Sequence, residues 1–163
     1  MATPIVMYEE EYELLKAVIA RLCQDANAKF VFLVDKNGQQ IAAFGDMTNL
    51  DTTSLASLTA GNVAATDGLA HLIWERGFPV LSHEGEKDNI HISIVASRVI
   101  LVVIFDERSS LGLVRLRVKR ATSELNTIFE TIDSKVARER DMGIELDSPF
   151  AEITEEDIDA LFR

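Results

Sequence analysis

Cysteine, proline, tryptophan and long apolar runs are all scarce in this chain of 163 residues, which contains one cysteine, three prolines and one tryptophan. A single cysteine cannot form an internal disulfide and gives no ligand spacing for a metal site, which agrees with a reducing cytosol. The longest strongly apolar run, Val99–Phe105, is seven residues long, whereas a membrane helix needs about 20. The N-terminus lacks a basic segment that leads into an apolar one. We therefore expect a cytoplasmic protein with no transmembrane segment.

Positive charge is also scarce, because 16 Lys and Arg residues stand against 27 Asp and Glu residues, for a formal net charge of −11. Non-specific binding to nucleic acid needs a basic surface that neutralises phosphates, so we expect no nucleic-acid partner. The negative charge is concentrated at one end, since residues 141–163 contain eight acidic residues and a single basic one, Arg163.

Motifs for catalysis are missing as well. The chain has neither a Walker-type phosphate loop nor a Gly-x-Gly-x-x-Gly sequence after an expected strand. We interpret His71, His83 and His91 as surface or edge residues, because local geometry does not bring them together as a metal site. Cys23 falls inside an expected helix, where a cysteine usually packs as a small apolar residue. The sequence thus predicts no catalytic residue, no cofactor and no metal.

The spacing of apolar residues defines the elements that are present. Repeats of three or four residues indicate helices, and alternation or short β-branched runs indicate strands. We expect helices over Tyr8–Ala26, Asp51–Arg76 and Ser110–Val136, and strands over Phe30–Asp35, Ile41–Phe44, Val80–His83, Ile90–Ile94 and Val99–Phe105. Asn37-Gly38 predicts a tight hairpin between the first two strands, and the last three strands form a meander in the simplest arrangement. The predicted order is α-β-β-α-β-β-β-α.

The second expected helix has an unusual surface. Five small residues, which we call the small-residue stripe, recur along it at helical spacing: Ser57, Gly61, Ala64, Ala65 and Gly68. Each glycine inside a helix costs about 1 kcal/mol relative to alanine, which is unfavourable for a helix that only covers a core. Such a surface lets another backbone approach closely. The sequence leaves three partners open: the chain's own sheet, the same helix of a second copy, or a different protein.

The C-terminal segment combines acidic and apolar residues. After a polar linker expected over residues 138–149, Thr154 and Asp157 have the spacing of a capping box for a short helix. A helix of that length is not stable alone in water, so its apolar residues are exposed unless they dock. We call them the tail anchors: Phe150, Ile153, Ile158, Leu161 and Phe162. The segment is either a disordered acidic end or a segment that folds on binding, and the tail anchors favour the second.

One basic cluster lies near the start of the third expected helix, and it consists of Arg115, Arg117, Lys119 and Arg120. The simpler interpretation is a solvated helix face in an acidic protein. A docking site for an acidic partner is the alternative.

Three segments carry a resemblance to a known family: Phe32–Gly38, Asp51–Ala65 and Phe105–Gly112. Together with the α-β-β-α-β-β-β-α order, these segments make the chain resemble the roadblock/dynein-light-chain family over about residues 5–140. The resemblance implies an α/β (α+β) fold with a five-stranded, mainly antiparallel sheet between helices. It implies a roadblock domain over residues 1–140, followed by an acidic linker and a short C-terminal helix over residues 141–163. It also implies a homodimer in which the two sheets join edge to edge and the two second helices pair.

The same resemblance implies a function. Family members of this kind bind one Ras-like small GTPase on the paired second helices, in a two-to-one complex, and some activate its GTP hydrolysis without inserting an arginine finger. By resemblance, the small-residue stripe is the GTPase-binding platform, and the tail anchors contact the GTPase at a second place. The chain would then be a GTPase activator of a bacterial partner enzyme, with no active site of its own. It would serve cell polarity and gliding motility, concentrate at a cell pole and meet further polarity proteins.

Two other functions remain open at this point. The first is a roadblock scaffold that binds a GTPase or a motor complex without accelerating hydrolysis. The second is a small-ligand sensor on a similar five-stranded sheet, which predicts an apolar pocket with convergent polar groups.

Overall fold

The computed structural model describes residues 5–146, 160 and 162 of the chain. Its helices are α1 (Glu9–Asp25), α2 (Thr52–Leu72) and α3 (Leu111–Leu146), and its strands are β1 (Phe30–Asp35), β2 (Gln40–Gly45), β3 (Val80–Glu84), β4 (Asn89–Val95) and β5 (Val99–Phe105). The order of elements expected from the sequence is confirmed.

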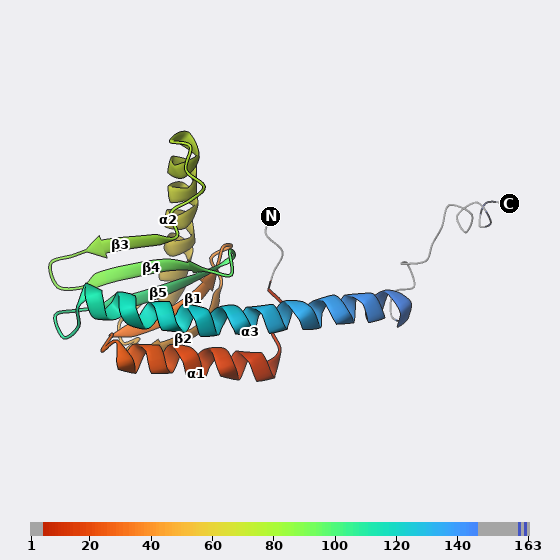
Figure 1. The fold of residues 1–163 in the computed structure, drawn as a ribbon, viewed down its shortest axis with the longest axis horizontal. Helices are drawn as coiled ribbons and strands as arrows, with labels where there is room; N and C mark the ends of the chain where they lie inside the picture. The colour runs from red at the N-terminus through yellow and green to blue at the C-terminus, as the bar shows by residue number, and fades with distance from the viewer. Residues whose placement is uncertain (1–4, 147–159, 161, 163) are drawn as a thin grey trace.

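The five strands form one antiparallel sheet in the order β2-β1-β5-β4-β3 (Figure 1). The expected β1–β2 hairpin and the β3–β4–β5 meander are both present. Pairing of β1 with β5 joins them, with Phe30 opposite Ile104 and Asp35 opposite Val99. Because β1 and β5 are inner strands, nearly all of their residues are buried on both faces of the sheet.

Helices cover both faces of the sheet. α1 and α3 lie side by side on one face, and α2 lies on the other (Figure 1). Successive side chains of a strand point to opposite faces, so β5 contributes to both layers. Its Leu101 and Val103 pack with α1 and α3, whereas Ile100 and Val102 pack with α2. The sheet between helices implied by the family resemblance is therefore confirmed.

α2 begins at Thr52 because the Asp51 carboxylate caps it. Asp51 Oδ1 accepts a hydrogen bond from the Ser54 N–H at 3.1 Å, and Asp51 Oδ2 accepts one from the Ser54 hydroxyl at 2.7 Å. These hydrogen bonds lower the pKa of the Asp51 carboxyl, so its negative charge is retained at the positive end of the helix dipole.

α2 ends at Leu72, before the end at Arg76 that the sequence suggested. The chain turns at Trp74, whose φ of +65° is left-handed, and the Glu75 N–H donates to the Ala70 carbonyl at 2.9 Å. This is the hydrogen-bond pattern of a Schellman motif, which closes a helix by satisfying a carbonyl of its last turn. The sequence missed this end because the motif normally has glycine where Trp74 stands.

α3 extends further than expected. The sequence suggested a helix to Val136 and a linker over residues 138–149, but the helix continues to Leu146. The linker prediction is therefore wrong for residues 138–146. Most residues there are good helix formers such as Arg, Glu and Met, and Gly143 does not interrupt the helix. None of the described helices is long and apolar enough to span a bilayer.

Candidate functional site

Only part of α2 is packed on the sheet. Ala56, Ala60 and Val63, in its first half, belong to the core beneath it. The second half projects away from the sheet (Figure 1). Leu55 packs against the same core while partly buried, and Thr59 and Ala70 are buried as well, so the rest of this 21-residue helix is left for other contacts.

The small-residue stripe lies on the exposed side of α2. All five of its residues are exposed, and a Cβ added at Gly61 or Gly68 would meet nothing within 4 Å. The stripe is therefore not packed against the chain's own sheet, which was one of the three interpretations that the sequence left open. The structure places the five residues on one face of a projecting helix, where a second backbone can approach closely.

The β1–β2 turn adjoins the first residue of the stripe. A Cβ at Gly38 would lie 3.2 Å from the Ser57 Cα, and Gly38 has a left-handed φ of +88°. The Asp35 carboxylate holds this turn, because its Oδ1 accepts hydrogen bonds from the backbone N–H groups of Asn37 and Gln39, each at 2.9 Å. The hairpin turn and the start of the stripe therefore form one continuous surface.

The end of α2 carries a second exposed surface, which the sequence analysis missed. We call it the apolar end of α2, and its side chains are exposed by 61% at Leu69, 77% at Leu72, 60% at Ile73 and 95% at Trp74. Trp74 has a left-handed φ, which disfavours every residue with a Cβ. A fully exposed tryptophan in that conformation contributes little to the stability of the single chain. The signal in the sequence was the apolar run Leu72-Ile73-Trp74 shortly before Gly77 and Pro79.

Strand β3 is an edge of the sheet. It pairs with β4 along one side, and no described strand pairs with its other side. Four of its five residues are exposed, including Val80 at 46%. An open edge of this kind presents free backbone N–H and C=O groups to another strand.

The structure agrees with the sequence-based interpretation of His71, His83 and Cys23 and differs for His91. His91 is buried on the inner strand β4, so its interpretation as a surface or edge residue is wrong. His71 and His83 are exposed, and His83 Nε2 lies 3.0 Å from the Asn62 side-chain amide. Cys23 is buried, and burial raises its pKa, which is the behaviour of a packing residue. Among residues 5–146, no three His, Cys, Asp or Glu residues are grouped as a metal site.

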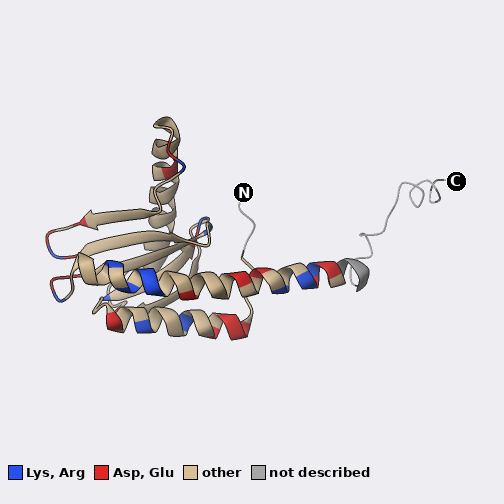
Figure 2. Ribbon diagram, viewed as in Figure 1, with Lys and Arg blue, Asp and Glu red and all other residues tan. Residues whose placement is uncertain are grey.

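The basic cluster is divided between two sides of α3. Arg115 and Lys119 line a groove beside β4, whereas Arg117 and Arg120 lie beside α1. The cluster that appears continuous in the sequence, and as blue segments in the first turns of α3 in Figure 2, is therefore not one patch.

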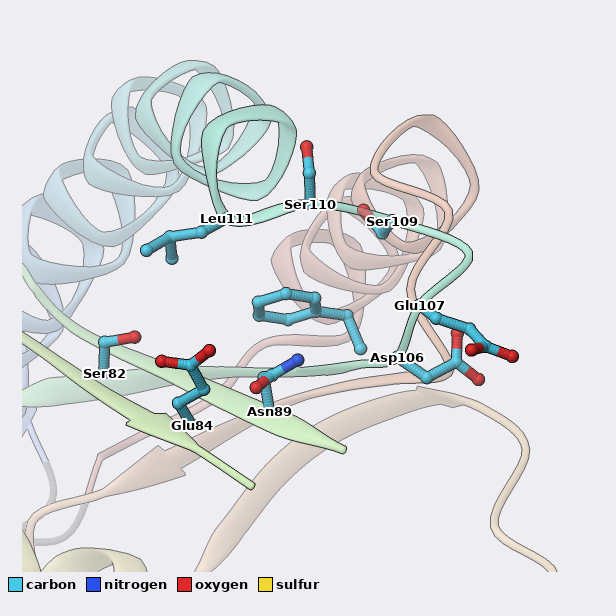
Figure 3. Close-up of a pocket in the computed structure, with 9 residues that line it drawn as sticks. Ser82, Glu84, Asn89, Asp106, Glu107, Ser109, Ser110 and Leu111 are labelled. Carbon is cyan, nitrogen blue, oxygen red and sulfur yellow. The ribbon is translucent and has the colours of Figure 1, made fainter. Parts of the chain in front are cut away.

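A cavity of about 210 Å³ lies near the start of α3 (Figure 3). Glu84 and Asn89 reach toward it from β3 and β4, and Leu111 lies on its opposite side. Asp106 on its rim accepts a hydrogen bond from Arg108 at 3.1 Å, which lowers the pKa of the Asp106 carboxyl. A general acid or base needs a pKa near the working pH, whereas the pKa of Asp106 is lowered by Arg108. We therefore assign this cavity no catalytic role.

The tail anchors lie almost entirely outside the described residues. Phe162 is the one that the structure describes, and it is 87% exposed. Phe150, Ile153, Ile158 and Leu161 fall outside, so the expected short helix and its contacts stay predictions.

Comparison with known proteins gives a consistent result. Residues 14–105 match the model of the Roadblock/LC7 domain family. The chain is similar to the solved structure of MglB from Myxococcus xanthus, with 64% identity, 78% of this chain and 96% of that chain covered, and a TM-score of 0.75. It is also similar to the gliding protein MglB from Thermus thermophilus, with 31% identity, coverage of 80% and 99%, and a TM-score of 0.74. A structure of MglB with a tetrameric arrangement is 30% identical, with coverage of 81% and 99% and a TM-score of 0.75. No curated protein matches the chain.

Proposed function

The chain belongs to the Roadblock/LC7 domain family, and on this premise we propose that it is an MglB-like activator and regulator of a bacterial Ras-like small GTPase. It acts as a homodimer in the control of cell polarity and gliding motility, in the cytoplasm and concentrated at a cell pole. The observation that carries the proposal is the small-residue stripe, exposed on a projecting helix in a chain 64% identical to an MglB.

The stripe suits the approach of switch loops. A helix surface without long side chains lets the backbone of a partner's loop lie close to it. At Gly61 and Gly68 the helix backbone itself is the surface, because no neighbouring atom covers these positions. The adjoining β1–β2 turn, held by Asp35, adds a rigid border at the Ser57 end.

The proposed acceleration is positional. The GTPase supplies its own catalytic residues, and the activator holds the switch loops so that the attacking water is aligned. Two arginines at element ends of this chain are already engaged, because Arg98 pairs with Asp133 and Arg108 pairs with Asp106 at 3.1 Å. Both arginines are therefore engaged by carboxylates of the chain itself, and the proposal that no arginine finger is inserted rests on the family resemblance.

Two surfaces support the homodimer. The open edge of β3 allows two sheets to join, and the apolar end of α2 exposes four large apolar side chains that a second copy would cover. The apolar end lies on the same helix as the stripe, and β3 is the next element along the chain. Pairing through them would place two stripes beside each other and so form one platform for one GTPase.

The tail anchors provide the second proposed contact. Their apolar side chains, between acidic residues, suit a segment that orders on a partner surface. We assign them to a site on the GTPase away from the platform, where they adjust its affinity or its nucleotide exchange.

The non-catalytic scaffold uses the same platform, so kinetics must separate it from the activator. The test is single-turnover GTP hydrolysis by the Ras-like GTPase of the same organism, with and without this protein in excess. We expect a large acceleration that is lost when an arginine is placed on the stripe. Binding without acceleration would support the scaffold, and absence of binding would contradict both.

A further inference from the structure

A groove separates the first half of α3 from strands β3 and β4, and we call it the α3–β4 groove. Its volume is about 410 Å³, and its walls include Val80, His91, Ser93, Arg115, Val118 and Lys119. His91 and Ser93 lie on the same face of β4 as Val95, which packs in the core beneath α1 and α3. The groove is therefore on the opposite face of the sheet from α2 and from the proposed GTPase platform.

Two buried polar side chains of the groove lack partners. His91 is 2% exposed and Ser93 is 5% exposed, yet His91 Nδ1 and Ser93 Oγ make no hydrogen bond to any described residue. A buried polar atom without a partner costs about 1–3 kcal/mol, so nearly all such atoms in folded proteins have one. Both residues line the groove, and because Nδ1 and Oγ have almost no accessible surface, their side chains must turn toward the groove to pair with a molecule bound there.

Two cations of the groove also lack partners. Arg115 and Lys119 are one turn apart on α3 and so lie on the same side of the helix. Neither forms an ion pair with a described acidic residue, whereas Arg98 and Lys135, elsewhere in the chain, both do. In a chain with a net charge of −11, these two cations give the groove a local positive charge that no described carboxylate neutralises by an ion pair.

His91 adds a hydrogen bond but no charge. Burial, and then the nearby Arg115 charge, lower the pKa of His91, so its imidazole is neutral at pH 7. A neutral imidazole has one nitrogen that donates and one that accepts. The positive charge of the groove therefore comes from α3 alone, and the β4 wall offers uncharged hydrogen-bonding groups between apolar ones.

We propose that the α3–β4 groove binds a small organic anion, one with an apolar body and a single acidic group. Val80 and Val118 contact the apolar body, Arg115 and Lys119 bind the acidic group, and His91 and Ser93 gain hydrogen bonds from the bound molecule. The volume lies in the range of about 300–1,000 Å³ that is usual for small-molecule sites. The site uses none of the platform residues, and one of its wall residues, Val80, lies on β3, the edge strand that the proposed homodimer would join.

The test uses the full chain labelled with ¹⁵N and ¹³C, titrated with hexanoate and, separately, with hexyl phosphate at constant ionic strength. We expect saturable changes in the amide signals of Ser93 and Lys119 and in the ring signals of His91. Hexan-1-ol and hexylamine, which have the same apolar body without the negative charge, should bind at least tenfold more weakly. The tighter of the two anions identifies the acidic group as carboxylate or phosphate.

A pair of variants matched for charge completes the experiment. Arg115→Gln with Lys119→Gln should weaken binding at least tenfold, whereas Arg117→Gln with Arg120→Gln, on the α1 side of the same helix, should not change it. If the first double variant is misfolded by its amide spectrum, Lys119→Gln alone replaces it. The proposal is wrong if neither anion gives saturable shifts, if the alcohol binds equally well, or if both double variants bind alike. It is also wrong if shifts appear only after residues 147–163 are deleted, because the tail would then be the occupant.

Discussion

Gly38, in the β1–β2 turn, lies against Ser57, the first residue of the small-residue stripe on α2. A Cβ at Gly38 would be 3.2 Å from the Ser57 Cα and 3.6 Å from the Ala60 Cβ. The turn therefore contacts α2 within the part of the helix that covers the sheet, at the first residue of its exposed stripe. This contact fixes the position of the proposed platform relative to the sheet.

Replacing Gly38 should test that contact. Gly38→Ala introduces a Cβ at a φ of +88° and within 3.2 Å of a backbone atom, so we expect a loss of about 1–3 kcal/mol in the free energy of unfolding. Gly112→Ala is the matched control, because a Cβ there meets nothing within 4 Å and helical alanine is favoured by up to about 1 kcal/mol. Urea denaturation of both variants measures the difference. Equal midpoints for the two variants would contradict the close approach.

Arginine on the stripe should abolish GTPase binding without unfolding the protein. Ala64 and Gly68 are exposed in the single chain, so Ala64→Arg and Gly68→Arg should leave the fold intact and weaken binding at least about tenfold. Ser134→Arg adds the same side chain at an exposed position of α3, on the other face of the sheet, and should bind normally. Titration calorimetry with the GTPase bound to a GTP analogue gives the affinities. Unchanged affinity of the stripe variants would remove the platform assignment.

Trp74 provides a test of the homodimer. Because its φ is left-handed, Trp74→Gly should stabilise the single chain by up to about 1 kcal/mol, yet we expect it to weaken dimerisation at least about tenfold. Met142→Ser removes an exposed apolar side chain from α3 and should not affect dimerisation. Sedimentation equilibrium measures the dimer.

Trp74 is the chain's one tryptophan, so its fluorescence should also shift to shorter wavelength as the dimer forms. A dimer of unchanged strength in Trp74→Gly would exclude the apolar end from the interface.

Deleting residues 148–163 should alter GTPase affinity or nucleotide exchange while preserving the fold. All described helices and strands lie within residues 9–146, so we expect the circular dichroism melting temperature to change little. The control keeps the length and acidity of the tail but replaces its five apolar anchors with serine, and it should behave like the deletion. If the serine variant instead behaves like the natural chain, charge and not apolar contact is what the tail contributes.

The contact between α1 and α3 should make stability depend on pH. Lys135 on α3 donates to the carboxylate of Glu11 on α1, and this hydrogen bond lowers the pKa of Glu11 and raises the pKa of Lys135. Glu11 therefore contributes stability above its unfolded pKa of about 4.3, and that contribution is lost as pH falls through its lower folded pKa. Lys135 contributes below its unfolded pKa of about 10.4 and loses its contribution as pH rises through its higher folded pKa.

Lys135→Gln should therefore destabilise the protein at pH 7 and have little effect near pH 2, where Glu11 is protonated. Lys87→Gln, at an exposed position in the β3–β4 turn, is the control and should have little effect at either pH. Urea midpoints of the three proteins at both pH values give the comparison. A Lys135→Gln effect that is independent of pH would show that packing of the lysine stem, and not its ion pair, stabilises the contact.

The local elements of the fold were predictable because their signals are local. Asn37-Gly38 between two β-branched runs predicted the first hairpin, and Asp51 predicted the start of α2, which its carboxylate caps at 3.1 Å. The ends were less predictable. α2 ends four residues early because Trp74 takes a left-handed φ that residue preferences assign to glycine, and α3 continues through a segment whose polarity resembled a linker.

The candidate site was predictable only in part. The small-residue stripe was evident in the sequence because helical spacing places Gly61 and Gly68 on one face, but the sequence did not show whether that face met the chain's own sheet. The apolar end of α2 and the α3–β4 groove were not predicted. His91 was interpreted as a surface residue, since nothing in its local sequence shows that β4 is an inner strand covered by α3.

The sequence by itself determined the types and order of the elements and the scarcity of motifs for catalysis, because hydrophobic period, turn residues and composition are properties of neighbouring residues. Only the tertiary structure decided that β1 pairs with β5, that the small-residue stripe of α2 faces away from the sheet, and that the basic cluster divides between two sides of α3. Those outcomes depend on contacts between residues far apart in the chain, which are selected by how the three helices and the sheet bury their apolar faces together.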